Sequence, residues 1–67
     1  MTIQEASKYG DIGVLFNGDG RDGTGIGWFW EVNCGYQSWG SKDYYDDIAD
    51  AYSNLVDFIK TWEGPTK

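Results

Sequence analysis

The most restrictive feature of this sequence is the alternation of side chains over residues 26–34, IGWFWEVNC. Every second position there is apolar, and in an extended chain these positions share one side: Ile26, Trp28, Trp30, Val32 and Cys34. A period of two is typical of a β-strand with one buried face. The pattern therefore predicts a strand over 26–34 whose apolar side faces the core.

Two shorter patterns flank this strand and predict partners for it. Residues 11–17, DIGVLFN, also alternate, with Ile12, Val14 and Phe16 on one face. Residues 36–39, YQSW, follow a glycine turn and are typical of a third, shorter strand. We expect the three strands to form an antiparallel sheet in meander order.

A long helix is predicted for the C-terminal third of the chain. Apolar residues recur there at spacings of three and four, which places them on one stripe of a helix: Tyr45, Ile48, Tyr52, Leu55, Ile59 and Trp62. We expect Ser41 or Asp43 to cap the helix and Gly64-Pro65 to stop it. The stripe should pack on the sheet face formed by Val14, Phe16, Trp28 and Trp30.

The N-terminal segment predicts a second, short helix. Thr2 and Glu5 have the spacing of a capping box, and Gly10 is a suitable end for the helix. An edge strand over residues 2–4, TIQ, is the alternative. The expected architecture is one α+β domain over residues 1–67, with a three-stranded antiparallel meander sheet and one long C-terminal helix on one face.

The domain has to be held by apolar packing. A chain of 67 residues is close to the lower size limit for an independent core. The lone Cys34 excludes an internal disulfide, and the absence of His argues against zinc. Four Trp, five Tyr and three Phe supply the apolar area instead. A free cysteine, with no signal peptide and no membrane span, is typical of a cytoplasmic protein.

The glycine-rich stretch 17–25, NGDGRDGTG, raises the question of a calcium site. A helix–loop–helix calcium loop needs oxygen ligands at its first, third and fifth positions, glycine at the sixth and Glu at the twelfth. Counted from Asn17, Arg21 falls fifth and Trp28 twelfth. Asn-Gly and Asp-Gly are, by contrast, favoured dipeptides of hairpin turns. We expect a turn, with no metal and no cofactor.

The sequence carries no recognisable catalytic constellation. Without His, neither a serine nor Cys34 has its usual activating base. The run GDGRDGTGIG lacks the lysine of a phosphate-binding loop, and its aspartates would repel phosphate. We expect a protein that is not an enzyme.

Acidic residues form the main candidate site. The net charge is −6, and five aspartates would fall within about 100° of arc on the outer face of the predicted helix: Asp43, Asp46, Asp47, Asp50 and Asp57. The helix macrodipole favours the first three but leaves Asp50 and Asp57 unexplained. Along the predicted helix, the five carboxylates would average one charge per roughly 4–5 Å, which is near the phosphate spacing of a single DNA strand. The prediction is a face that binds a basic protein surface, with a merely solvated acidic face as the alternative.

Aromatic residues are the second candidate. Trp39 and Tyr44 flank the junction of the third strand and the helix, where we expect them to anchor a partner. If the second sheet face is uncovered, Leu15 and Phe29, with Trp39 beside them, would form an apolar patch. A helix or a dimer mate over that face is the alternative. Exposed aromatics beside carboxylates also suit a carbohydrate- or peptide-binding module.

In kind, the chain resembles the small acidic proteins with which bacteriophages block host defences, including anti-CRISPR proteins. The likeness rests on the length, the helix DYYDDIADAYSNLVDF and the lack of catalytic or secretory signals. It implies an inhibitor in the host cytoplasm that mimics nucleic acid and occupies a basic nucleic-acid-binding or subunit-contact surface, without binding nucleic acid or membranes itself.

The sequence also allows other interpretations of the function. The segment SWGSKDYYDDIADAYSNLVDFIKTW is also similar to small antitoxin domains of sheet-plus-helix form, although these usually carry a separate DNA-binding segment. A structural accessory protein and a homodimer are further alternatives.

Overall fold

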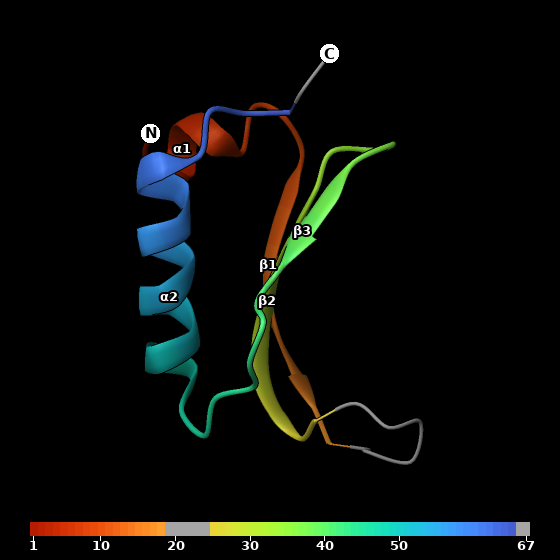
Figure 1. Ribbon diagram of the computed structural model, residues 1–67, viewed down its shortest axis with the longest axis vertical. Coiled ribbons are helices and arrows are strands. Elements are labelled where there is room, and N and C mark those ends of the chain that lie inside the picture. Colours follow the sequence, from red (N-terminus) through yellow and green to blue (C-terminus); the bar gives the residue numbers. More distant parts are fainter. Residues whose placement is uncertain (19–24, 66–67) are drawn as a thin grey trace.

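The computed structural model describes residues 1–18 and 25–65 of the chain. The elements follow in the order α1 (Ile3–Ala6), β1 (Asp11–Asn17), β2 (Gly27–Asn33), β3 (Ser38–Gly40) and α2 (Ile48–Thr61). The strands form one antiparallel sheet in the order β1-β2-β3, and α2 lies along one face of it (Figure 1). The predicted α+β architecture and the meander order are confirmed.

The sheet register follows the predicted alternation. β1 pairs with β2 along its whole length: Asp11 lies opposite Asn33 at one end, and Asn17 lies opposite Gly27 at the other. Val14 therefore lies opposite Trp30. β1 has the predicted bounds, whereas β3 begins two residues later than expected. A turn occupies those residues, because Cys34 N–H donates to the Gln37 carbonyl at 2.8 Å. Residues 19–24 come between β1 and β2 in the sequence and are not described, so the predicted turn and the calcium alternative, which involve Asp19 and Asp22, lie outside the described residues.

The short helix α1 forms by the predicted capping box. Thr2 N–H donates to Glu5 Oε1 at 2.8 Å, and Glu5 N–H donates to Thr2 Oγ1 at 3.1 Å. The alternative of an edge strand is therefore wrong. Ala6 in α1 is fully buried, which attaches this single turn to the core.

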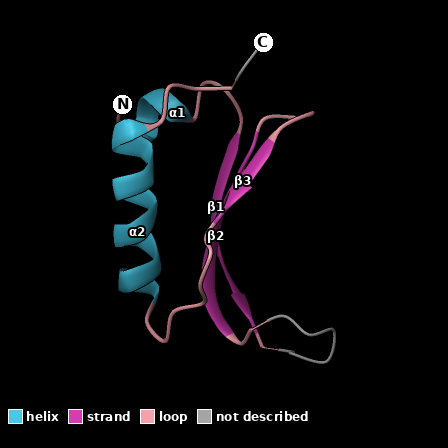
Figure 2. Cartoon of the chain, in the orientation of Figure 1, coloured by secondary structure: helices cyan, strands magenta, loops and turns pink. Residues whose placement is uncertain are grey.

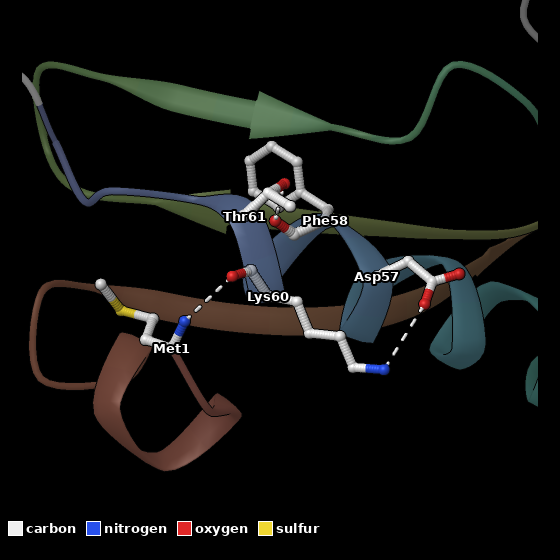
Figure 3. A network of polar contacts seen from close by, with 5 residues as sticks. All are labelled: Met1, Asp57, Phe58, Lys60 and Thr61. Carbon is white, nitrogen blue, oxygen red and sulfur yellow. Dashed lines mark hydrogen bonds and ion pairs between the residues drawn. The ribbon is translucent and has the colours of Figure 1, made fainter.

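The first residue also contacts the far end of the chain. The Met1 ammonium donates to the carbonyl oxygen of Ile59 at 3.1 Å. It also donates to that of Lys60 at 3.4 Å (Figure 3). Carbonyls in the last turn of a helix have no partner within the helix and carry its negative dipole end. A positive group is therefore well placed there, and it holds α1 beside the end of α2.

The core lies between β2 and α2 and consists mainly of aromatic and aliphatic side chains. The Trp30 ring packs on Phe58 with centroids 4.7 Å apart, and Trp62 meets Trp39 edge-on at 5.1 Å. Six buried residues form its centre: Ala6, Trp30, Val32, Leu55, Ile59 and Trp62. Cys34 packs at the margin of this cluster, as a small apolar residue would. The aromatic packing expected from the composition is present.

The helix begins later than predicted, because residues 41–45 are bonded to the sheet. Tyr45 exchanges two backbone hydrogen bonds with Trp28, at 2.7 and 2.8 Å, and is therefore extended. Ser41 Oγ accepts from Trp30 N–H at 3.3 Å and donates to the Asp43 carbonyl at 2.9 Å. The N-cap is Asp47, whose carboxylate accepts from Ala49 N–H at 2.9 Å. The prediction of a cap at Ser41 or Asp43 is wrong.

This later start also changes the buried stripe. Tyr45 lies outside α2, and Ile48 and Tyr52 are 47% and 51% exposed. Leu55, Ile59 and Trp62 of the predicted stripe are buried as expected, and Ala51 is buried with them.

On the sheet side, the predicted contact is only partly formed. Phe16 is 56% exposed and meets the half-buried Trp28 edge-on at 5.2 Å. The ends of β1 and β2 that carry these two residues extend past the first turn of α2 (Figure 1). The helix therefore covers Val14 and Trp30 more fully than Phe16 and Trp28.

The Trp28–Tyr45 bridge depends on Gly27. Gly27 has a φ of +136°, and a Cβ placed there would lie 2.6 Å from the Tyr45 carbonyl oxygen. We expect Gly27→Ala to destabilise the fold by about 2 kcal/mol or more, measured by urea unfolding, because it adds both strain and a backbone clash. Gly40→Ala is the control, since its nearest neighbour would lie at 3.6 Å and its φ is not positive. Equal effects of the two substitutions would contradict this account.

The capping box predicts a pH-dependent contribution from Glu5. The hydrogen bond from the Thr2 backbone, and then that from its side chain, lowers the pKa of the Glu5 carboxyl. A lowered folded-state pKa gives stability that is present above the unfolded pKa and is lost as pH falls through the folded pKa. Between about pH 7 and about pH 3, thermal melts should lose less stability in Glu5→Gln than in the wild type. Identical losses would show that the capping carboxylate does not contribute.

Candidate partner-binding site

The prediction that the five aspartates share one helix face is wrong. Asp43 and Asp46 precede α2, Asp47 is its N-cap, and only Asp50 and Asp57 lie within it. All five are exposed. Asp50 and Asp57 are about two turns apart, and so on the same side of α2. The spacing calculated for a continuous helix from residue 43 is therefore wrong.

Local helix energetics explains more of the acidity than the sequence suggested. Asp47 and Asp50 both lie at the N-terminus of α2, where negative charge is favourable. The expectation that the macrodipole leaves Asp50 unexplained is therefore wrong. Asp57 lies 4.0 Å from Lys60 Nζ (Figure 3), but both side chains are about 70% exposed, at 72% and 67%. Such surface pairs contribute about 1 kcal/mol or less.

A cleft of about 540 Å³ lies between β3, the segment that follows it, and α2. We call it the β3–α2 cleft. It brings together three of the predicted site residues, Trp39, Asp43 and Asp57. Its lining also includes Trp30, Asn54 and Phe58, none of which the sequence analysis assigned to a site. Because residues 41–45 follow the sheet edge, Asp43 lies across this cleft from α2 and not on it.

Asn54 is held in a fixed orientation at the cleft. The indole N–H of Trp30, which is 3% exposed, donates to Asn54 Oδ1 at 2.7 Å. The Asn54 amide nitrogen makes no hydrogen bond within the described part of the chain. It is therefore available to a ligand. Asn54 lies four residues after Asp50 and three before Asp57, a spacing that places all three on one side of the helix.

The aromatic wall of the cleft is backed by the core. Trp39 is the register partner of Val32, which puts its side chain on the sheet face toward α2. Phe58 and Trp39 both contact Trp62, with centroids at 6.0 and 5.1 Å. Side chains packed in this way keep their rotamers. The wall is therefore formed before any ligand arrives.

Tyr44 lies on the opposite face of the sheet from Trp39. Its ring meets that of Phe29 at 5.5 Å, and Leu15, the strand partner of Phe29, is 42% exposed. The side chains of Trp39 and Tyr44 therefore leave the sheet on opposite faces, and Trp39 is not part of the Leu15–Phe29 patch. Among residues 1–18 and 25–65, no helix or strand covers this face (Figure 2). A depression of about 310 Å³ lies at the β3 edge of the sheet, and its lining includes Phe29, Glu31 and Tyr44 as well as Trp39.

No family model, curated protein or solved structure matches this chain at a significant level. Within the described ranges, His, Cys, Asp and Glu form no group of three suited to a metal ion. The helices in those ranges are too short or too polar to cross a membrane.

The Trp30–Asn54 hydrogen bond should stabilise the wall of the cleft measurably. Removing the acceptor leaves a buried indole N–H unpaired, so we expect Asn54→Ala to cost about 1–3 kcal/mol in urea unfolding. Ser53→Ala, at the exposed neighbouring position, makes a similar gain in helix propensity and should change stability by less than about 0.5 kcal/mol. A neutral Asn54→Ala would show that this bond does not stabilise the fold.

Proposed function

We propose that this chain is a non-enzymatic binding protein whose acidic side docks on a basic surface of another protein. One observation carries the proposal. Asp43, Asp46, Asp47 and Asp50 form no ion pair with any residue in the described ranges, and Asp57 has only the exposed pair with Lys60. Apart from the N-cap bond that Asp47 accepts from Ala49 N–H, the first four carboxylates have no charged partner in these ranges and can meet a basic surface. They follow one another along the connection into α2 and its first turn, and Asp57 adds a further charge at the β3–α2 cleft.

The net charge of −6 gives this docking a physical advantage. Charge complementarity accelerates encounter with a basic partner and suppresses contact with acidic ones. Exposed charges are screened beyond about 10 Å at 0.1 M salt, so the association should weaken as salt rises. A surface of this sign also repels nucleic acid and anionic membranes, which favours a protein partner.

The narrower proposal is an anti-CRISPR type of inhibitor, encoded by a phage and acting in the host cytoplasm. Its support is the resemblance in size, acidity and lack of a catalytic constellation. With the aspartates spread over a loop and a helix, the acidic side fits a basic subunit contact or nucleic-acid groove better than it imitates a regular phosphate backbone. Inhibition would result from occupying that surface.

A paired charge reversal tests this function. Asp43→Lys with Asp46→Lys alters two exposed residues before α2 and spares the N-cap Asp47. We expect the wild type to restore plasmid transformation in bacteria with an active CRISPR–Cas system, and the double variant to lose this effect about tenfold or more. The same change should abolish salt-sensitive capture of a protein from lysates of those cells.

The control carries the same change in net charge at a distance from the site. Asp11→Lys with Glu63→Lys alters two exposed acids, at the start of β1 and after α2. This control should behave as the wild type does. If neither protection nor salt-sensitive capture appears in any of a panel of CRISPR–Cas systems, the anti-CRISPR proposal is wrong. If both double variants act as the wild type does, the acidic side is not the contact.

A carbohydrate-binding module is the second candidate, favoured by the depression at the β3 edge of the sheet. Its wall combines the Phe29 and Tyr44 rings with polar groups of Glu31, Asn33 and Ser38. Sugars bind by stacking on such rings and by hydrogen bonds to such groups. Titration with neutral oligosaccharides would then shift the amide resonances of these residues.

A further inference from the structure

The β3–α2 cleft combines carboxylates and aromatic rings in a way that a solvated acidic surface does not require. Asp43 enters its lining from the segment after β3, and Asp57 enters from α2. Trp39 and Phe58 also line it, and both of their rings pack against that of Trp62 in the core. A cleft of about 540 Å³ is within the range of ligand sites in proteins.

We propose that this cleft receives an arginine side chain of the basic partner, whose guanidinium stacks on the aromatic wall and pairs with Asp43 and Asp57. The inference rests on the proposed function, because it assumes that the partner surface is basic. It adds the residue type that the partner must present and the place where it is bound.

The charges of the cleft favour a cation. Asp43 and Asp57 outnumber the single cation in the lining, Lys42, which is exposed. Lys60, whose Nζ is 4.0 Å from Asp57, is the only residue in the described part of the chain that forms an ion pair with that carboxylate. This pair is exposed and near the distance limit of an ion pair, so an incoming cation can replace it at little cost.

The aromatic wall favours arginine over lysine. A guanidinium is planar and weakly hydrated, stacks on aromatic faces and donates up to five hydrogen bonds in a fixed fork. Two carboxylates reached from different elements suit such a fork better than they suit a compact, strongly hydrated ammonium. The Asn54 amide nitrogen, which its bond from Trp30 leaves unpaired, can donate to a carbonyl oxygen of the same partner segment.

Two double variants of equal net charge test the cleft with a defined probe. The probe is a hexa-arginine peptide blocked at both ends, titrated into the ¹⁵N-labelled protein and followed by NMR, with hexa-lysine in parallel. We expect the indole resonance of Trp39 and the side-chain amide of Asn54 to shift. Asp43→Asn with Asp57→Asn should weaken binding about tenfold, as expected for two partly exposed ion pairs.

The control double variant, Asp46→Asn with Asp50→Asn, neutralises the same number of aspartates outside the cleft lining. It should weaken binding less than about threefold, and melting curves should show that both variants are folded. An equal loss in both would overturn the cleft assignment while leaving general acidic docking intact. Equal affinity for hexa-lysine would overturn the preference for guanidinium.

Two further outcomes separate this inference from the proposed function. If the peptide leaves the cleft unperturbed while charge reversal still abolishes partner capture, the arginine site is wrong and the acidic docking stands. If neutral oligosaccharides, and not the peptides, shift the cleft resonances, the cleft is a sugar site and the arginine assignment is wrong, whereas the acidic docking is decided by the charge-reversal experiment alone.

Discussion

The packing of Trp30 between sheet and helix is the interaction on which the rest of the structure depends. Trp30 lies on the central strand β2, packs against Phe58 with tilted rings and donates its indole N–H to Asn54 at 2.7 Å. A chain of 67 residues with no internal disulfide needs such a residue, because one indole supplies both a large apolar area and a directional bond. The apolar contact sets the distance between the layers. The hydrogen bond sets the position of α2 along the sheet.

Local sequence patterns predicted the parts of the fold that local physics determines. The bounds of β1 follow from its alternation, and α1 follows from the capping box of Thr2 and Glu5. The start of α2 could not be predicted in this way. Residues 43–47 have a helical pattern of polar and apolar side chains. The backbone of Tyr45 nevertheless pairs with that of Trp28, which lies 17 residues earlier in the sequence. A contact so distant in sequence leaves no periodic signal.

The same long-range pairing explains why the candidate site was only partly predictable. Composition pointed to the aspartates, and Trp39, Asp43 and Asp57 do meet at one cleft. The predicted single arc of five aspartates required a helix that begins four residues or more too early. Asn54 and Phe58 were missed because their spacing on α2 fits the core as well as a site. The segment that fails to become helix is the segment that forms the opposite wall of the cleft.

β1 has a consequence for how copies of this chain meet one another. It is an outer strand of the sheet, seven residues long, and among residues 1–18 and 25–65 no strand pairs with its other side. Unpaired N–H and C=O groups along such an edge are a template for a strand from another molecule. Asp11 is the only charged residue within it. At high concentration, edge-to-edge addition through β1 is therefore the expected route of self-association, and the repulsion between molecules of net charge −6 is what opposes it.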